Sequence, residues 1–134
     1  MHKYRETGLK LTPQRLAILD YLDGNKSHPS AEEIFKAVSK RFSTMSFATV
    51  YNTIEALKKK GMIFELTIDP YKKRFDPDTT SHHHIICIRC GKVSDVSENQ
   101  MKLNMPKVSI RDFKIMSWHI DFHGLCRECE GKEN

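Results

Sequence analysis

The chain has 134 residues, of which 39% are hydrophobic, and it carries a net charge of +5. This length fits one domain or two small ones, and the hydrophobic content is sufficient for packed cores. The sequence shows neither an apolar run long enough to span a membrane nor an N-terminal stretch typical of a secretory signal, so we expect a cytoplasmic protein.

The excess positive charge lies in the first half of the chain. Residues 1–76 contain 14 Lys and Arg against 9 Asp and Glu, whereas residues 77–134 contain 8 of each kind. This asymmetry is typical of a nucleic-acid-binding domain followed by a neutral domain with another task. A basic surface that only keeps the protein soluble would give the same charge pattern. We therefore predict domains at 1–76 and 77–134.

Helix signals dominate the first sixty residues. Thr12 precedes Pro13 as a capping residue, Ser30 and Glu33 form a capping-box pattern, and Ser46 precedes a third helix that we expect from Phe47 to Lys60. Residues expected on the buried faces of the three helices are Leu16, Leu19, Leu22, Ile34, Val38, Phe42, Val50, Ile54 and Leu57.

A β-hairpin is expected directly after the third helix. Gly61 ends the helix, Met62–Ile68 has strand character, Asp69-Pro70 favours a turn, and Lys73–Asp76 forms the returning strand. Three helices followed by a two-stranded wing make a winged helix-turn-helix domain. We therefore expect an α+β protein that begins with a DNA-binding module.

The third helix is the expected DNA-reading element. With its apolar stripe turned inward, Thr49, Tyr51 and Asn52 are left outside near its N-terminus, the part of a reading helix that meets base edges. An Asn side chain can bond bidentately to adenine in the major groove. The candidates for phosphate contacts are Lys10, Arg15 and Lys58. For any one lysine the alternative is a solvated helix end that complements the helix dipole.

The four cysteines form two pairs with matching spacing. They are Cys87-x-x-Cys90 and Cys126-x-x-Cys129. Four thiolates from two such pairs suit a closed tetrahedral zinc site with a structural role. Two disulfides, a redox-active pair and ordinary buried thiols are the alternatives, and disulfides rarely persist in the cytoplasm.

Strand patterns surround these cysteines. Ile85–Ile88 and Val93–Val96 flank the first pair, and alternate residues from Met116 to Phe122 are apolar on one face of a later strand. We expect a small, zinc-pinned α/β dimerisation domain, because a second copy would let two reading helices engage a palindrome. A monomeric satellite domain is the alternative.

Three consecutive histidines, His82–His84, stand directly before the first cysteine pair. Imidazoles together with carboxylates make a harder nitrogen and oxygen site than thiolates do, which suits iron, manganese, nickel or zinc. Surface histidine runs without a ligand are the alternative.

In this order, the motifs of the chain resemble those of the ferric uptake regulator family of bacterial metal-dependent repressors, and most closely its peroxide-sensing branch. The matching segments are Leu11–Arg15, His28-Pro29, Ser46–Tyr51, Arg74–Asp76, His82–His84, Cys87–Lys92 and Cys126–Cys129. The resemblance implies a homodimer that represses transcription from double-stranded operator DNA, with structural Zn²⁺ on the four cysteines.

The resemblance also implies a regulatory Fe²⁺ or Mn²⁺ site. Its implied ligands are His28, Asp76, His82, His84 and Asp95. Asp76 and Asp95 fit the peroxide-sensing branch, whereas iron-uptake regulators typically have Glu at the place of Asp76. In that branch hydrogen peroxide oxidises ligand histidines of the iron form, here His28 and His82, and repression is lifted.

Other functions share some of these sequence features. A relative that responds to iron or manganese levels without sensing peroxide would share these motifs. A zinc metalloenzyme would need an open coordination position and a general base, and a non-DNA metal binder would leave the basic half unexplained. Three histidines, His83, His119 and His123, could build an auxiliary metal site, although they differ from the family pattern for such a site.

Overall fold

The computed structural model describes residues 8–80, 82–101, 109–116 and 118–132 and divides the chain into two compact units. We call Met1–Thr79 the N-terminal unit and Thr80–Asn134 the C-terminal unit. Among the described residues, no helix has both the length and the apolar character that a membrane crossing requires.

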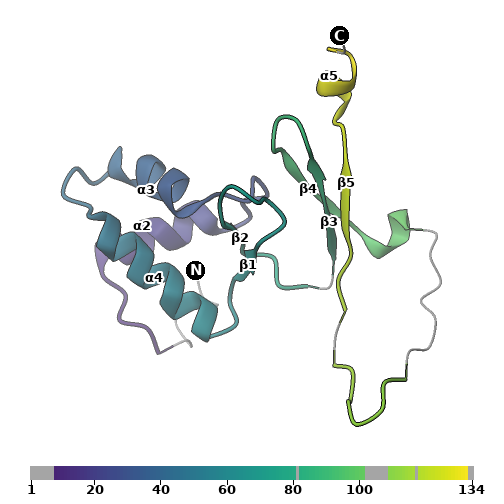
Figure 1. Ribbon diagram of the computed structural model, residues 1–134. Helices are drawn as coiled ribbons and strands as arrows, with labels where there is room; N and C mark the ends of the chain where they lie inside the picture. Colours follow the sequence, from purple (N-terminus) through teal and green to yellow (C-terminus); the bar gives the residue numbers. More distant parts are fainter. Residues whose placement is uncertain (1–7, 81, 102–108, 117, 133–134) are drawn as a thin grey trace. The chain divides into compact units, whose positions relative to one another are not determined.

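Three helices form most of the N-terminal unit (Figure 1). They are α2 (Pro13–Leu22), α3 (Ala31–Ser39) and α4 (Phe47–Lys59). Each begins at a side-chain cap. Thr12 Oγ1 accepts the Arg15 N–H at 3.2 Å, Ser30 and Glu33 exchange two hydrogen bonds of 3.2 Å, and Ser46 Oγ accepts the Thr49 N–H at 3.1 Å. These caps satisfy backbone donors that a helix leaves unpaired, and they confirm the predicted helix starts.

The core of the N-terminal unit joins all three helices to the hairpin. Its buried members are Ile18, Leu19, Leu22, Ile34, Val38, Met45, Val50, Ile54, Leu57, Ile63 and Phe75. Two predictions were wrong in detail. Leu16 is only half-buried and Ile18 is buried in its place, while Phe42 lies beyond the end of α3 and packs against the core from the following loop.

The hairpin is shorter than the sequence predicted. Strands β1 (Phe64–Leu66) and β2 (Arg74–Asp76) pair antiparallel, with Phe64 opposite Asp76 and Leu66 opposite Arg74. Between the strands, Asp69 Oδ1 accepts the Tyr71 N–H at 2.9 Å, an Asx-type turn. The short wing brings Asp76 to the end of β2.

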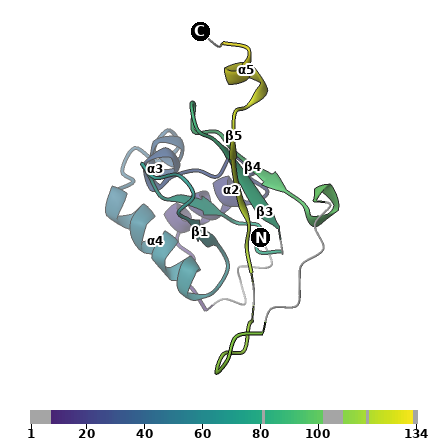
Figure 2. The same cartoon turned by 45° about the vertical axis from the view of Figure 1, so that its right-hand side comes forward.

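A three-stranded sheet forms the C-terminal unit (Figure 2). Strand β3 (His83–Cys87) lies between antiparallel β4 (Val93–Val96) and parallel β5 (Asp121–Gly124), and the short helix α5 (Arg127–Glu130) follows β5. The strand expected from Met116 begins only at Asp121, so Met116 and Trp118 precede it. β3 ends at Cys87 rather than Ile88, because the Gly91 N–H turns back to the Cys87 carbonyl at 2.9 Å.

The C-terminal unit has a small apolar core. Its buried apolar side chains among the described residues are Ile86, Cys87, Val93 and Cys129. Small units of this size are usually stabilised by a metal or by association, because a small core alone rarely offsets the entropy of ordering the chain.

Candidate metal centres

The four cysteines come together at one end of the C-terminal sheet. Each offers a sulfur within 4.8 Å of the others, and Cys90 Sγ lies 3.8 Å from Cys126 Sγ. A disulfide would bring two sulfurs to about 2.05 Å. Tetrahedral zinc, with Zn–S bonds of about 2.3 Å, spaces its sulfurs about 3.8 Å apart. All four cysteines are free thiols, so the arrangement fits a tetrahedral metal and not the disulfide alternative.

The surroundings of the sulfurs shift the pKa values of two of the thiols, Cys87 and Cys129, in opposite directions. Backbone N–H groups of Cys126 and Cys90 donate to Cys87 and lower the pKa of its thiol to about 5. The thiol of Cys129 donates to Cys126, and this bond together with burial raises the pKa of Cys129 to about 12. One sulfur is therefore ready to bind a cation, while another holds a proton that the cation must displace.

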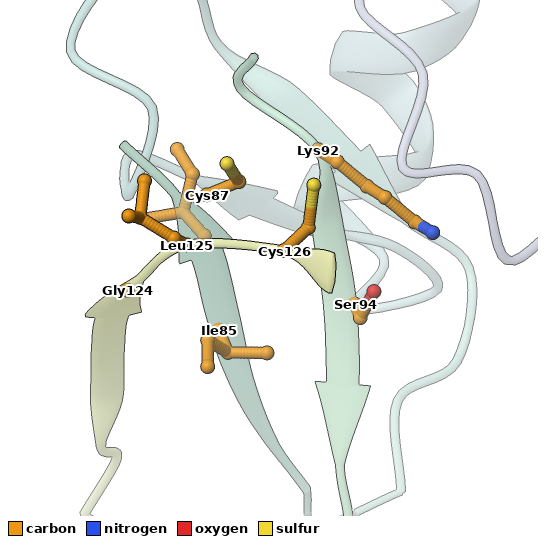
Figure 3. Close-up of a pocket in the computed structure, with 8 residues that line it drawn as sticks. Ile85, Cys87, Lys92, Ser94, Gly124, Leu125 and Cys126 are labelled. Carbon is orange, nitrogen blue, oxygen red and sulfur yellow. The ribbon is translucent and has the colours of Figure 1, made fainter. Parts of the chain in front are cut away.

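A cavity of about 150 Å³ adjoins the cysteine cluster (Figure 3). Ile85, Gly124 and Leu125 line it together with Ile86, Cys87, Lys92, Ser94 and Cys126. Figure 3 shows Lys92 and Ser94 on the β4 side, with Ile85 and Leu125 around the adjoining strands. The lining is mostly apolar.

The first histidine of the implied regulatory set lies beside an acid within the N-terminal unit. His28 Nε2 is 3.5 Å from Asp76 Oδ2, and Asp76 Oδ1 accepts the Asp78 N–H at 2.9 Å. Two nitrogen or oxygen ligands of one divalent metal ion, at bond lengths near 2.1 Å, are about 3.0 to 3.5 Å apart. The pair therefore has the spacing of two ligands in one coordination sphere.

Arg74 holds the loop that carries His28. His28 has a positive φ of 54°, which is uncommon for a residue with a side chain. Its carbonyl accepts from Arg74 Nη1 at 3.0 Å, and the Phe75 N–H donates to the Pro29 carbonyl at 2.9 Å. Arg74 Nε in turn donates to Asp69 Oδ2 at 3.1 Å. Strand β2 thus places Asp76 and fixes the backbone of His28 at the same time.

This supporting role of Arg74 and Asp69 was missed by the sequence analysis. The available signal was an arginine inside the short apolar strand Arg74–Asp76, because a buried guanidinium needs acceptors. Both side chains are at most 10% exposed. Burial raises the pKa of the Asp69 carboxyl, but hydrogen bonds from the Tyr71 N–H and Arg74 outweigh burial and leave this pKa below its usual value.

We expect Asp69→Asn to destabilise the N-terminal unit at pH 7 by about 1.5–3 kcal/mol, since it removes the nearer carboxylate of the buried Arg74 and leaves only Glu33 Oε1, which lies 3.9 Å from Arg74 Nη1. The folded-state pKa of Asp69 is lowered, so its contribution is present above the unfolded pKa of about 3.9 and is lost as pH falls toward the folded value. Urea unfolding followed by far-ultraviolet circular dichroism at pH 7 and pH 3 measures this. The difference from wild type should shrink at pH 3, and Asp20→Asn, an exposed carboxyl on α2, should change little at either pH. A difference that is equal at both pH values would contradict the ion pair's role.

The remaining implied ligands converge within the C-terminal unit. His82 Nε2 and His84 Nε2 lie 3.4 and 3.3 Å from Asp95 Oδ1, and β3–β4 pairing sets His84 directly opposite Asp95. His82 Nδ1 lies 2.7 Å from the Thr80 carbonyl, which can only accept, so Nδ1 carries the proton and Nε2 keeps its lone pair. A hydrogen bond of this kind orients an imidazole for a metal.

His83 has a different task. Its ring stacks on Trp118 with centroids 4.8 Å apart, and its Nδ1 accepts the Ile120 N–H at 3.0 Å. Its proton is therefore on Nε2, which lies 3.5 Å from Glu98 Oε1. Nδ1 is occupied by the bond from Ile120, and Nε2 is buried without a hydrogen-bond partner among the described residues. His83 therefore presents no lone pair to a metal and packs within the C-terminal unit instead. Among the described residues, His123 belongs to no potential metal-binding group.

The candidate DNA contacts differ in how exposed they are. Tyr51 is 50% exposed and Asn52 is exposed beside it on α4. Thr49 is half-buried, with its hydroxyl 2.9 Å from Ser46 Oγ in the helix cap. The exposed part of the predicted reading surface is therefore Tyr51 and Asn52, while Thr49 contributes to the start of the helix.

The basic candidates are partly engaged within the protein. Lys58 Nζ donates to Glu65 at 2.8 Å and to Glu55 at 3.2 Å, and the Glu65 bond is the main reason that the pKa of Lys58 is raised. Arg15 Nη1 donates to the Lys10 carbonyl at 3.1 Å. Lys58 would have to leave two carboxylates to bind a phosphate, whereas the side chain of Lys10 is exposed.

Known proteins with similar sequences belong to one family. The model of the ferric uptake regulator family matches residues 6–123. The peroxide operon regulator of Bacillus subtilis strain 168 is 39% identical over 131 residues, covering 97% of this chain and 90% of the relative. The peroxide-responsive repressor PerR of Staphylococcus aureus strain Mu50 is 39% identical over 129 residues, covering 96% and 87%.

Solved structures agree with these sequence matches. The ferric uptake regulator of Helicobacter pylori superposes with a TM-score of 0.75 at 25% identity, over 99% of this chain and 90% of that one. The peroxide stress regulator of Campylobacter jejuni gives 0.70 at 25% identity, over 96% and 97%. These proteins are transcription regulators, so the metalloenzyme alternative is set aside. The chain belongs to the ferric uptake regulator family of metal-responsive transcription regulators.

Proposed function

We propose that this protein is a repressor that binds palindromic operator DNA as a homodimer when iron(II) or manganese(II) occupies its regulatory site, and that hydrogen peroxide releases it. The observation that carries the proposal is the donor set. His28 and Asp76 in one unit, and His82, His84 and Asp95 in the other, have the ligand spacing described above. Three imidazoles and two carboxylates, without a thiolate, suit iron(II) or manganese(II).

The division of the ligands between the two units explains why the metal would act as a switch. An ion that binds all five ligands at once requires one relative orientation of the units. Metal binding would then select the arrangement that suits both halves of a palindrome, and the metal-free protein would sample others. The same reasoning makes Arg74 a positioning residue, because it fixes the His28 backbone from β2.

Dimerisation is supported by the apolar surface of the C-terminal unit. The exposed large apolar side chains there are Ile85, Ile88, Ile110, Phe113, Ile115, Met116, Trp118 and Leu125. Ile85 and Leu125 also line the cavity beside the cysteines. A small unit whose described residues include few buried apolar side chains and this many exposed ones gains most by packing against a second copy. The four-cysteine cluster would hold zinc that stabilises the fold of this unit.

Peroxide sensing is supported by Asp76 and by what the relatives are called. Two of the relatives are a peroxide operon regulator and a peroxide-responsive repressor. Iron(II), when bound, would supply one-electron reduction of hydrogen peroxide, a reaction that manganese(II) does not supply. His28 and His82 would be oxidised as neighbours of the iron, and the loss of an imidazole ligand would weaken the site and lift repression. A regulator that responds to metal levels alone is the competing proposal.

Sequence-specific DNA binding by α4 provides the test. A duplex recovered by selection from a random library with manganese-loaded protein supplies the probe. We expect Asn52→Ala to reduce discrimination at one base pair in each half-site by about 1–3 kcal/mol, since a bidentate amide contact is lost. Fluorescence anisotropy with matched and substituted duplexes measures this at several salt concentrations.

The control separates reading from phosphate binding. Lys59→Ala, at an exposed position on the same helix, should weaken all duplexes alike and reduce the salt slope by about one. Metal-independent binding, or discrimination that Asn52→Ala leaves unchanged, would count against α4 as the reading helix.

A further inference from the structure

Two side chains next to His84 have no part in the proposed regulatory site. His119 Nε2 lies 3.4 Å from His84 Nδ1 and 2.6 Å from Asp121 Oδ1. One nitrogen or oxygen from each of the three residues lies within 4.8 Å of the others. All three residues belong to the C-terminal unit.

The parallel pairing of β3 with β5 creates this cluster. His84 stands directly opposite Asp121, and the His84 N–H donates to the Ile120 carbonyl at 3.3 Å. His119 is two residues before Asp121, so an extended backbone turns both side chains to the same side. The rings of His84 and His119 have centroids 5.2 Å apart. Chain pairing thus brings together two imidazoles and a carboxylate from distant parts of the sequence.

We propose that His84 Nδ1, His119 Nε2 and Asp121 Oδ1 form a second divalent-metal site for a borderline ion such as zinc(II), cobalt(II) or nickel(II). Two imidazoles and one carboxylate, with water completing the coordination sphere, are an ordinary ligand set for such ions. The separation of 3.4 Å between the two nitrogens already matches two ligands of one ion.

The shorter contact must lengthen when a metal binds. At 2.6 Å, His119 Nε2 and Asp121 Oδ1 share a hydrogen bond. Metal binding replaces this proton, and the two atoms must then separate to about 3 Å. His119 is 42% exposed and Asp121 is 38% exposed, so both side chains have room for this adjustment.

His84 makes this site and the regulatory site mutually exclusive. Its Nε2 faces Asp95 and its Nδ1 faces His119. A neutral imidazole has a single lone pair, because its other nitrogen carries the proton. An ion on Nδ1 therefore removes His84 from the regulatory set. Such an ion takes ligands from one unit only and cannot fix the relative orientation of the two units, so its binding would oppose that of the regulatory metal. This consequence rests on the proposed function, whereas the site itself does not.

The test is a cobalt(II) titration of the full chain with structural zinc retained. The background variant His28→Ala/His82→Ala removes the two regulatory imidazoles other than His84. We expect this variant to bind one cobalt(II) ion, detected by the visible d–d absorption of cobalt(II) in a protein site. Adding His119→Ala or Asp121→Asn should weaken this binding by about tenfold or more, and adding His123→Ala should leave it unchanged.

Three outcomes would overturn the proposal. In the first, the background variant binds no cobalt(II) while zinc occupies the four cysteines. In the second, it binds cobalt(II) with an affinity that His119→Ala does not change. In the third, His119→Ala alters only the manganese affinity of the otherwise wild-type protein, which would make His119 and Asp121 a hydrogen-bonding support for His84. Failure of the proposed function is a separate result, since it would appear as manganese-independent DNA binding of the wild-type protein.

Discussion

Replacing Cys126 with Ser is expected to unfold the C-terminal unit while the N-terminal unit remains folded. The four sulfurs lie within 4.8 Å of one another, close enough to bind one zinc ion, and the described part of the unit buries few apolar side chains. Structural zinc supplies on the order of 10–16 kcal/mol of folding free energy at pH 7, which equals or exceeds the whole stability of an ordinary domain. Loss of one thiolate should therefore remove most of what holds this unit together.

Trp118 makes this measurable, because it is the single tryptophan of the chain and stacks on His83 within the C-terminal unit. Thermal unfolding should show an early or absent Trp118 fluorescence transition in Cys126→Ser, while the helical circular dichroism of the N-terminal unit melts as in wild type. His123→Ala, three residues earlier in the chain, is the control and should keep both transitions. A Cys126→Ser protein without zinc but with an unchanged fluorescence transition would show that the metal is not structural.

Asp76→Glu is expected to separate peroxide sensing from metal-dependent DNA binding. The longer side chain keeps a carboxylate available to the metal but adds one carbon–carbon bond of about 1.5 Å beside His28. A displacement of about 1 Å can slow a positioned reaction by about 100-fold. We expect manganese-dependent DNA binding to persist, while the iron form loses DNA binding much more slowly in peroxide than wild type does.

The matched control is Asp20→Glu, which adds the same carbon to an exposed acid on α2. It should leave metal binding and peroxide response as in wild type. If Asp76→Glu and wild type lose DNA binding at the same rate in peroxide, then Asp76 does not distinguish a peroxide sensor from a metal-level regulator.

The features that the sequence predicted well depend on local chemistry. Hydroxyl caps at Thr12, Ser30 and Ser46 satisfy backbone donors within one turn, so the start of each helix is visible in a few residues. Two cysteines at C-x-x-C spacing indicate a pair of metal ligands, because both thiols lie within a few residues of one another. Their assembly into one cluster was expected because both pairs share the same spacing and no cysteine is left over.

Features that depend on distant pairing were missed or misplaced. The apolar alternation from Met116 to Phe122 suggested a long strand, but pairing with β3 begins only at Asp121. Arg74 stands within the short motif Arg74–Asp76, but its bond to the His28 carbonyl joins residues 46 positions apart. The contact of His119 with His84 likewise depends on strand order. No local pattern in the sequence encodes which strand will be the neighbour.

The measurement that tests peroxide sensing most directly is mass spectrometry of tryptic peptides after peroxide treatment of iron(II)-loaded and manganese(II)-loaded protein, with DNA binding measured on the same samples. The account predicts one added oxygen on the peptides that contain His28 or His82, in the iron form only and together with loss of DNA binding. Unmodified histidines in an iron form whose DNA binding follows metal concentration alone would contradict it and would identify a regulator of metal uptake.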